Sequence, residues 1–277
     1  KNNVDANAFI HPEFQQTITA TGRLSSRNPN FQNMPRGSTF EIRKVVESRF
    51  DGGKIVEGDY SQLEFRVAGF LAKDRQAYDD VVNGTDVHSY TASVIGYTRQ
   101  EAKAHTFKPL YGGVSGTEDQ QRYYRAFKEK YAGVKEWHER LQREAVKHKQ
   151  IKLPSGRQYA FPDAKWTEWG TATNRTAICN YPVQGFATAD LLPVCLIRLS
   201  HLVEQNNLQS VICNTVHDSI VMDVHPDEKD ICIKLMTEAM LAIPEEVQKR
   251  YNVQYTMPVD IELKIGYNWL DLHEVNV

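Results

Sequence analysis

The segment "LQSVICNTVHDSIVMDV" constrains the fold most, because two β-rich runs meet in it at His217 and Asp218. Runs this close together pair as an antiparallel hairpin. A third β-rich run, residues 54–60, ends in Asp59-Tyr60 and precedes a helical pattern over residues 62–72. Helices and strands occur in separate stretches, so the sequence predicts an α+β fold with an antiparallel sheet.

Further elements follow from local signals. Thr98 and Glu101 form a capping box that starts a helix at Arg99, and Pro109 should kink or end that helix. Apolar residues at helical spacing predict one long helix over residues 118–149. Helices are also expected within residues 84–96, 190–205 and 227–242, a hairpin within 151–162, and a strand within 257–266.

Composition leaves the function open. The net charge is −2, which gives no global signature of nucleic-acid binding, so any such function must rest on local chemistry. The four cysteines are widely spaced without a C-x-x-C pair, and we expect reduced thiols rather than disulfides or zinc ligands. We expect no membrane-spanning run and no signal peptide, and therefore no membrane partner.

Two acids end β-rich runs, Asp59 and Asp218, and each is expected at the rim of the same sheet. A buried carboxylate is usually paired, hydrogen-bonded or bound to a metal. Two acids converging there could hold two divalent cations, and Mg²⁺ suits such a site because it also takes oxygens from water and phosphates. The alternative for either aspartate alone is a turn or strand-end cap.

A stripe of residues spaced four apart follows the helix that begins at Arg99: Arg99, Lys103, Phe107 and Tyr111. Each step of four drifts only about 40° around a helix axis. A triphosphate could lie against the two cations while an aromatic ring packs on the sugar or base. The alternative is a solvated helix face beside the core.

Together these segments resemble the palm and fingers of a family A DNA polymerase. The matching segments are "TATGRLSSRNPNFQN", "DYSQLEFRVAGFLAKD" (motif A), the Arg99–Gly112 series (motif B), "NYPVQGFATAD", "VHDSIV" (motif C) and "IELKIGYNWL". The resemblance implies palm at residues 1–66 and 183–277, with fingers at 67–182. It also implies dNTP and primer–template DNA as partners and a bacterial or phage-infected cytoplasm as the location.

The resemblance assigns roles to individual residues. Asp59 and Asp218, with the carbonyl of Tyr60, would hold two Mg²⁺ ions, and Glu64 with Tyr111 would exclude a ribose 2′-hydroxyl. The remaining residues would contact the triphosphate and nucleotide (His88, Arg99, Lys103, Phe107) or the primer–template near its terminus (Arg23, Gln184, His217). The alternatives are a packed helix histidine for His88 and a helix acid paired with a neighbouring base for Glu64.

The sequence departs from the family pattern in several places. Ser219 stands where motif C usually has Glu, Pro109 lies within the fingers segment, and Arg175 is one position from the usual arginine, so it receives no role. Few residues precede "TATGRLSS", where the family has a thumb subdomain. We therefore expect a split polymerase of bacteriophage type, whose second polypeptide supplies the thumb and a 3′–5′ exonuclease; a trimmed fragment is the rival interpretation.

Two other functions compete. A single-subunit RNA polymerase shares this palm, and its motif C can read His-Asp-Ser. A non-catalytic DNA-binding subunit is the other, although both aspartates and the Arg-Lys-Phe-Tyr series are intact.

Overall fold

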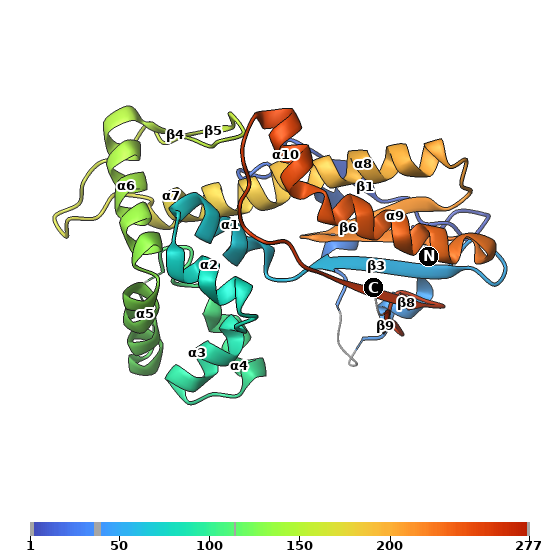
Figure 1. Cartoon of the computed structure of the whole chain (residues 1–277), viewed down its shortest axis with the longest axis horizontal. Coiled ribbons are helices and arrows are strands. Elements are labelled where there is room, and N and C mark those ends of the chain that lie inside the picture. Colours follow the sequence, from blue (N-terminus) through green and yellow to red (C-terminus); the bar gives the residue numbers. More distant parts are fainter. Residues whose placement is uncertain (1–2, 36–39, 114, 276–277) are drawn as a thin grey trace. The chain divides into compact units, whose positions relative to one another are not determined.

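The computed structural model describes residues 3–35, 40–113 and 115–275 (Figure 1). The chain divides into two compact units. The sheet unit comprises residues 1–61, 188–249 and 259–277, and the helical unit comprises residues 62–187 and 250–258.

An antiparallel five-stranded sheet forms the centre of the sheet unit, in the order β6-β7-β3-β8-β9. Its strands are β3 (Lys54–Tyr60), β6 (Val211–Val216), β7 (Ser219–Val224), β8 (Ile261–Gly266) and β9 (His273–Val275). The predicted strands and the hairpin at residues 217–218 are thus confirmed, as is the α+β class. Short strands β1 (Glu13–Gln15) and β2 (Ser25–Arg27) pair separately in the N-terminal segment, and the sequence analysis predicted neither strand.

Helices α8 (Leu192–Gln205) and α9 (Lys229–Leu241) lie side by side on one face of this sheet (Figure 1). Because side chains alternate along a strand, Val56, Gly58 and Tyr60 of β3 share this face. A Cβ added to Gly58 would come within 2.6–2.7 Å of the sulfurs of Met236 and Met240 on α9. Only glycine therefore permits so close an approach of helix and strand.

The opposite face of β3 carries Ile55, Glu57 and Asp59. Ile55 belongs to a buried apolar cluster with Phe31, Val216, Val221 and Trp269. The buried Glu57 carboxylate accepts a hydrogen bond from the Trp269 indole, and the Arg43 guanidinium lies 4.0 Å from the centre of the Trp269 ring. This face is thus packed at Ile55 and Glu57, which lie two strand repeats and one strand repeat before Asp59.

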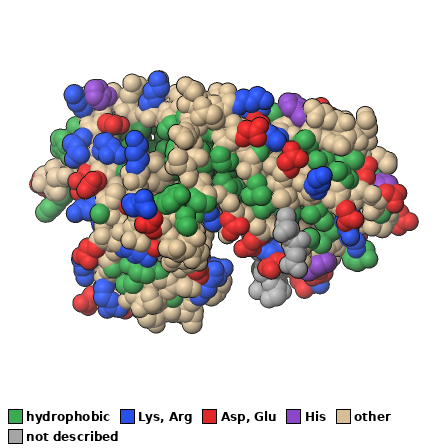
Figure 2. Space-filling view, in the orientation of Figure 1, with side chains coloured by type: hydrophobic (Ala, Val, Ile, Leu, Met, Phe, Trp, Pro, Cys, Tyr) green, Lys and Arg blue, Asp and Glu red, His purple; other side chains and the backbone are tan. Residues whose placement is uncertain are grey.

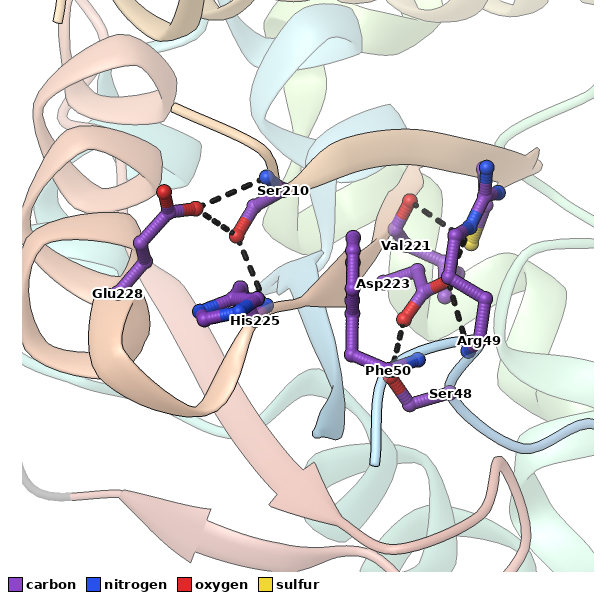
Figure 3. A network of polar contacts seen from close by, with 9 residues as sticks. Ser48, Arg49, Phe50, Ser210, Val221, Asp223, His225 and Glu228 are labelled. Atoms are coloured by element: carbon purple, nitrogen blue, oxygen red, sulfur yellow. Dashed lines mark hydrogen bonds and ion pairs between the residues drawn. The ribbon is translucent and has the colours of Figure 1, made fainter. Parts of the chain in front are cut away.

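Hydrogen bonds also fix β7 at the end remote from the 217–218 turn (Figure 3). Asp223 accepts from Ser48 Oγ at 2.5 Å and from Arg49 Nε at 2.7 Å. Nearby, Glu228 accepts from the Ser210 hydroxyl at 2.6 Å. These contacts tie β6 and β7 to flanking segments, and the turn itself lies at the other end of the hairpin.

The helical unit begins with α1 (Leu63–Ala72), α2 (Arg75–Val82), α3 (Val87–Ile95) and α4 (Arg99–Thr106). It continues with α5 (Glu118–Lys130), α6 (Ala132–His148), the hairpin β4–β5 (Gln150–Lys152 and Gln158–Ala160) and α7 (Arg175–Gln184). A π-helical segment over residues 185–191 leads from α7 into α8, and α10 (Ile243–Tyr251) follows α9. The sequence analysis expected neither α7 nor α10 as helices.

The prediction of one helix over residues 118–149 is wrong, because the helix breaks at Tyr131. The Tyr131 hydroxyl donates to Asp80 at 2.7 Å, and the Asp74 carboxylate accepts from the Val134 amide at 3.0 Å. Asp74 thus satisfies an amide at the start of α6, which lets a new helix begin there. Periodicity continues across such a break, so apolar spacing alone could not reveal it.

Residues 250–258 cluster with the helical unit, although the sequence analysis grouped them with residues 183–277. Their packing explains this: the Tyr255 ring lies 4.7 Å from that of Phe70, and the Pro258 carbonyl accepts from Arg66 at 2.8 Å.

One helical run, Arg175–Gln205, is long and apolar enough to cross a membrane by length and composition, contrary to the expectation from the sequence. Half of its most apolar window is buried within the protein, as it would be in a core helix. The four cysteines are free thiols, as expected.

Tyr60 ties the end of β3 to both helices, since its hydroxyl donates to the Met240 carbonyl at 2.8 Å and lies 2.9 Å from Cys195 Sγ. We predict that Tyr60→Phe lowers the free energy of unfolding by about 1–2 kcal/mol, because it leaves a buried carbonyl without this donor. Tyr255 provides the matched control, because its buried hydroxyl has no hydrogen-bond partner among the residues that the structure describes. Tyr255→Phe should leave stability unchanged or raised in urea titrations; an equal loss in both variants would contradict this account.

Candidate active site

Asp59 and Asp218 lie at the same end of the sheet. Asp59 of β3 is directly opposite Ser219 of β7, and Asp218 precedes Ser219. From the spacing of antiparallel strands, the Cα atoms of the two aspartates are about 6 Å apart. Both side chains are half-buried. The structure therefore brings together two acids that are far apart in the sequence.

The turn that carries Asp218 is a two-residue hairpin loop between β6 and β7. His217 adopts φ 57°, and positive φ at this first position is what favoured two-residue turns require. Ser219 is fully buried, and its hydroxyl donates to the Val216 carbonyl at 3.1 Å. The serine that replaces the family's glutamate thus closes the turn.

The oxygens at this sheet end are of the kind that Mg²⁺ binds. Asp59 and Asp218 offer carboxylates, and the Tyr60 carbonyl is adjacent in the chain. Within the described residues, no group of three or more His, Cys, Asp or Glu side chains is arranged to hold a metal by itself. Such a pair suits Mg²⁺, which takes its remaining oxygens from water and phosphates.

Glu262 and Lys264 on β8 were not singled out from the sequence. Glu262 lies directly opposite Asp59, and Lys264 Nζ is 3.0 Å from its carboxylate. Burial lowers the pKa of Lys264, but the hydrogen bond to Glu262 and the charges of Glu262, Asp59 and Glu274 outweigh it, so the pKa is raised. An ammonium therefore already neutralises part of the negative charge beside Asp59. Only strand register, which the sequence does not give, could have revealed this neighbour.

Two of the three predicted DNA-contacting residues line one small depression in the sheet unit. Arg23 and His217 meet there with Gln32 and Thr188. Arg23 Nε donates to Thr188 Oγ1 at 2.9 Å, and Gln32 Nε2 donates to the Thr215 carbonyl at 3.2 Å. The third residue, Gln184, is the last residue of α7 in the helical unit.

Helix α4 presents the basic part of the predicted stripe. Thr98 caps it through the expected capping box with Glu101, and Arg99 and Lys103 are exposed. The regular helix ends at Thr106, as Pro109 predicted. The Tyr111 amide still donates to the Phe107 carbonyl at 3.1 Å, and their rings lie 6.4 Å apart. The stripe thus continues through a turn.

His88 on α3 joins this stripe. Its Nδ1 lies 3.0 Å from Thr106 Oγ1, and its ring meets Phe107 edge to face at 5.3 Å. Burial lowers the pKa of His88, and the charges of Arg99 and Lys103 lower it further, whereas Asp86 opposes them. The imidazole is therefore neutral at pH 7 in the absence of a ligand.

Asp86, the N-cap of α3, was also missed by the sequence analysis. Arg99 Nε donates to its Oδ2 at 2.5 Å. Hydrogen bonds from Arg99, Ser89 and the His88 amide outweigh burial and lower the pKa of Asp86 to about 2. The D-x-H spacing was visible in the sequence, but its pairing with Arg99 required the packing of α3 on α4.

Glu64 and Tyr111, the predicted sugar-discriminating pair, both belong to the helical unit. Glu64 is half-buried in the first turn of α1, where a negative charge complements the helix dipole. Tyr111 is half-buried just beyond α4. The structure therefore places both residues in the same unit, and their role in sugar discrimination stays a prediction.

Charge on the visible face is mixed in both units: Lys and Arg side chains are interspersed with Asp and Glu (Figure 2). This agrees with the net charge of −2. Any recognition of nucleic acid must therefore depend on particular residues rather than on overall charge.

We compared the chain with known proteins. The sequence profile of DNA polymerase family A matches residues 2–271. DNA polymerase I of Lactococcus lactis subsp. lactis (strain IL1403) is 30% identical over 95% of this chain and 31% of its own length. DNA polymerase I of Pseudomonas aeruginosa is 31% identical over 95% of this chain and 30% of its own length.

Among solved structures, the POL domain of Pol1 from M. smegmatis, in complex with DNA primer-template and dNTP, has a TM-score of 0.80 at 26% identity. That match covers 98% of this chain and 50% of the other. The chain spans about a third of the length of the two curated relatives named above. A profile match over nearly the whole chain, joined to this fold, shows that the chain belongs to DNA polymerase family A.

Proposed function

We propose that this chain catalyses template-directed transfer of nucleotides from dNTPs to a primer 3′ end. The observation that carries the proposal is the placement of Asp59 and Asp218 at one end of an antiparallel sheet in a family A chain. The cationic start of α4 supplies the second requirement, a surface for a triphosphate.

In the reaction, the primer 3′-oxygen bonds to the α-phosphorus while the bond to the bridging oxygen breaks and pyrophosphate leaves. Asp59, Asp218 and the Tyr60 carbonyl would hold two Mg²⁺ ions. When bound, these ions lower the pKa of the 3′-hydroxyl and stabilise charge on the transferring phosphoryl group and on pyrophosphate. The protein's own contribution there is rigid placement of the carboxylates by β3 and the 217–218 turn.

Arg99 and Lys103 would bind the triphosphate, and their fixed charges would offset the charge that develops on pyrophosphate. His88 is neutral before the nucleotide binds, so it begins as a hydrogen-bond donor rather than as a third cation. Phe107 would pack on the nucleotide.

Arg23, Gln184 and His217 would contact the primer–template near its terminus. Minor-groove acceptors are nearly the same for every correct pair, so such contacts check pair geometry rather than sequence. Thr188 holds the Arg23 guanidinium in place for this role.

Thumb residues would supply contacts to the DNA backbone, and such contacts dominate affinity. The sequence analysis assigned them, with an exonuclease, to a second polypeptide of phage type. In the relatives it matches, this region is part of a longer chain, which gives the split arrangement no support. Size-exclusion chromatography of natively expressed material tests it: a lone 31.7 kDa species with full processive activity would refute a partner.

We predict that Asp59→Asn and Asp218→Asn each reduce primer extension on the order of 10³-fold, because each removes a metal-binding charge worth several kcal/mol. The exposed Asp230 provides a control, and Asp230→Asn should extend primers normally. DNA binding measured by fluorescence anisotropy should persist in all variants. Absence of extension by the unsubstituted protein would instead support the non-catalytic DNA-binding subunit, and extension by Asp218→Asn at the unsubstituted rate would remove Asp218 from the reaction.

Sugar selection separates the DNA polymerase from the RNA polymerase alternative. The unsubstituted protein should prefer dNTPs on a primed template, and Glu64→Ala should raise rNTP incorporation about tenfold or more, because a side chain that excludes the 2′-hydroxyl is removed. Single-turnover incorporation of matched dNTP and rNTP pairs measures both. Equal use of rNTPs by the unsubstituted protein would overturn the assignment.

The titration of His88 reports on the triphosphate surface. We predict a pKa below its ordinary value of about 6.5 in the ligand-free protein and a rise on adding inorganic tripolyphosphate, because a nearby anion favours the imidazolium. Lys103→Gln should also raise the pKa, since it removes a like charge. NMR of the His88 ring during a pH titration measures these values. A ligand-free pKa above 6.5 would contradict the packing described for His88.

A further inference from the structure

Asp86 is paired with the guanidinium of Arg99. The proposed function assigns this same guanidinium to the triphosphate. Arg99 Nε donates to Asp86 Oδ2 at 2.5 Å. A carboxylate presents the same charge sign and acceptor oxygens to arginine as a phosphate does. Arg99 thus already holds an anion when no nucleotide is bound.

The position of Asp86 does not depend on Arg99. Its Oδ1 accepts from the His88 amide at 3.2 Å, and its Oδ2 accepts from the Ser89 hydroxyl at 2.6 Å and the Ser89 amide at 3.2 Å. These contacts cap α3 and would keep the carboxylate ordered and ionised after Arg99 departs. Asp86 is therefore a fixed anion within reach of α4.

Arg99 is the more exposed partner. Its side chain is 54% exposed, compared with 28% for Asp86, and it extends from the first residue of α4 on a flexible stem. The guanidinium can therefore move between Asp86 and a bound phosphate while Asp86 stays in place.

We propose that Asp86 acts as a built-in phosphate surrogate: it holds Arg99 before the nucleotide binds and competes with polyphosphate for it. Asp86 is then a positioning residue that weakens triphosphate affinity and draws Arg99 back as pyrophosphate leaves. This inference rests on the proposed function, because it assumes that Arg99 binds the triphosphate.

Asp86→Asn tests the competition without removing the cap, because asparagine caps helices as well as aspartate does. Inorganic tripolyphosphate should bind the full chain about three- to fivefold more tightly by calorimetry at low salt, since an exposed ion pair no longer opposes it. The gain should shrink as salt is added. Asp79→Asn is the matched control: it breaks a comparable ion pair with Arg75, 2.9 Å long, on α2 and should leave the affinity unchanged.

A double-mutant cycle with Arg99→Gln tests whether Asp86→Asn changes tripolyphosphate binding through Arg99. Arg99→Gln alone should weaken tripolyphosphate binding, and in that background Asp86→Asn should change nothing further. In primer extension, Asp86→Asn should lower KM for dNTP without raising kcat. A loss of α3 would be seen by thermal unfolding, and Asp86→Ser, which also caps, provides a second variant.

Failure of the Asp86 proposal and failure of the Arg99 assignment give different results. If folded Asp86→Asn and Asp86→Ser bind tripolyphosphate no more tightly than the unsubstituted chain, Asp86 is not a phosphate surrogate. Arg99 would still be a ligand of the triphosphate in that case. An Arg99→Gln protein that binds tripolyphosphate as well as the unsubstituted chain overturns the assignment of Arg99 itself, and the surrogate with it.

Discussion

The register of β3 against β7 is the constraint on which the proposed chemistry depends. It places Asp59 opposite Ser219 and therefore beside the turn that carries Asp218. A slip of one residue would turn the Asp59 side chain toward α9, where Met236 and Met240 pack closely on Gly58. The missing Cβ of Gly58 and the hydroxyl of Tyr60 hold β3 in the productive register, so the apolar face of the strand fixes the position of the polar one.

Both charged surfaces contain their own counter-ions. Lys264 lies beside the carboxylates of Glu262 and Asp59, and Asp86 lies beside the guanidinium of Arg99. Ligand binding is then an exchange of ion partners rather than a new charge pairing, which lowers the net gain in affinity. The same exchange favours release of a charged product, which an enzyme that turns over repeatedly requires.

Local signals in the sequence predicted the elements that carry the site. The 217–218 turn, the strand ending at Asp59 and the capping box at Thr98 each depend on neighbouring residues, and each was placed correctly. The break at Tyr131 depends on Asp74 and Asp80 from another helix, and periodicity cannot report such contacts. Glu262 and Asp86 were missed for the same reason, because strand register and helix packing made them neighbours of Asp59 and Arg99.

Ser219 shows how the chain accommodates the loss of an acid in motif C. It is fully buried and its hydroxyl closes the turn, so the substitution leaves no gap beside Asp218. If Asp59 and Asp218 hold Mg²⁺ as proposed, the ion would take most of its oxygens from water and phosphate. Metal affinity should then rise when a triphosphate is present, because the nucleotide supplies ligands that the protein lacks. By linkage, the metal strengthens nucleotide binding to the same extent. The missing glutamate thus makes binding of metal and of nucleotide more interdependent.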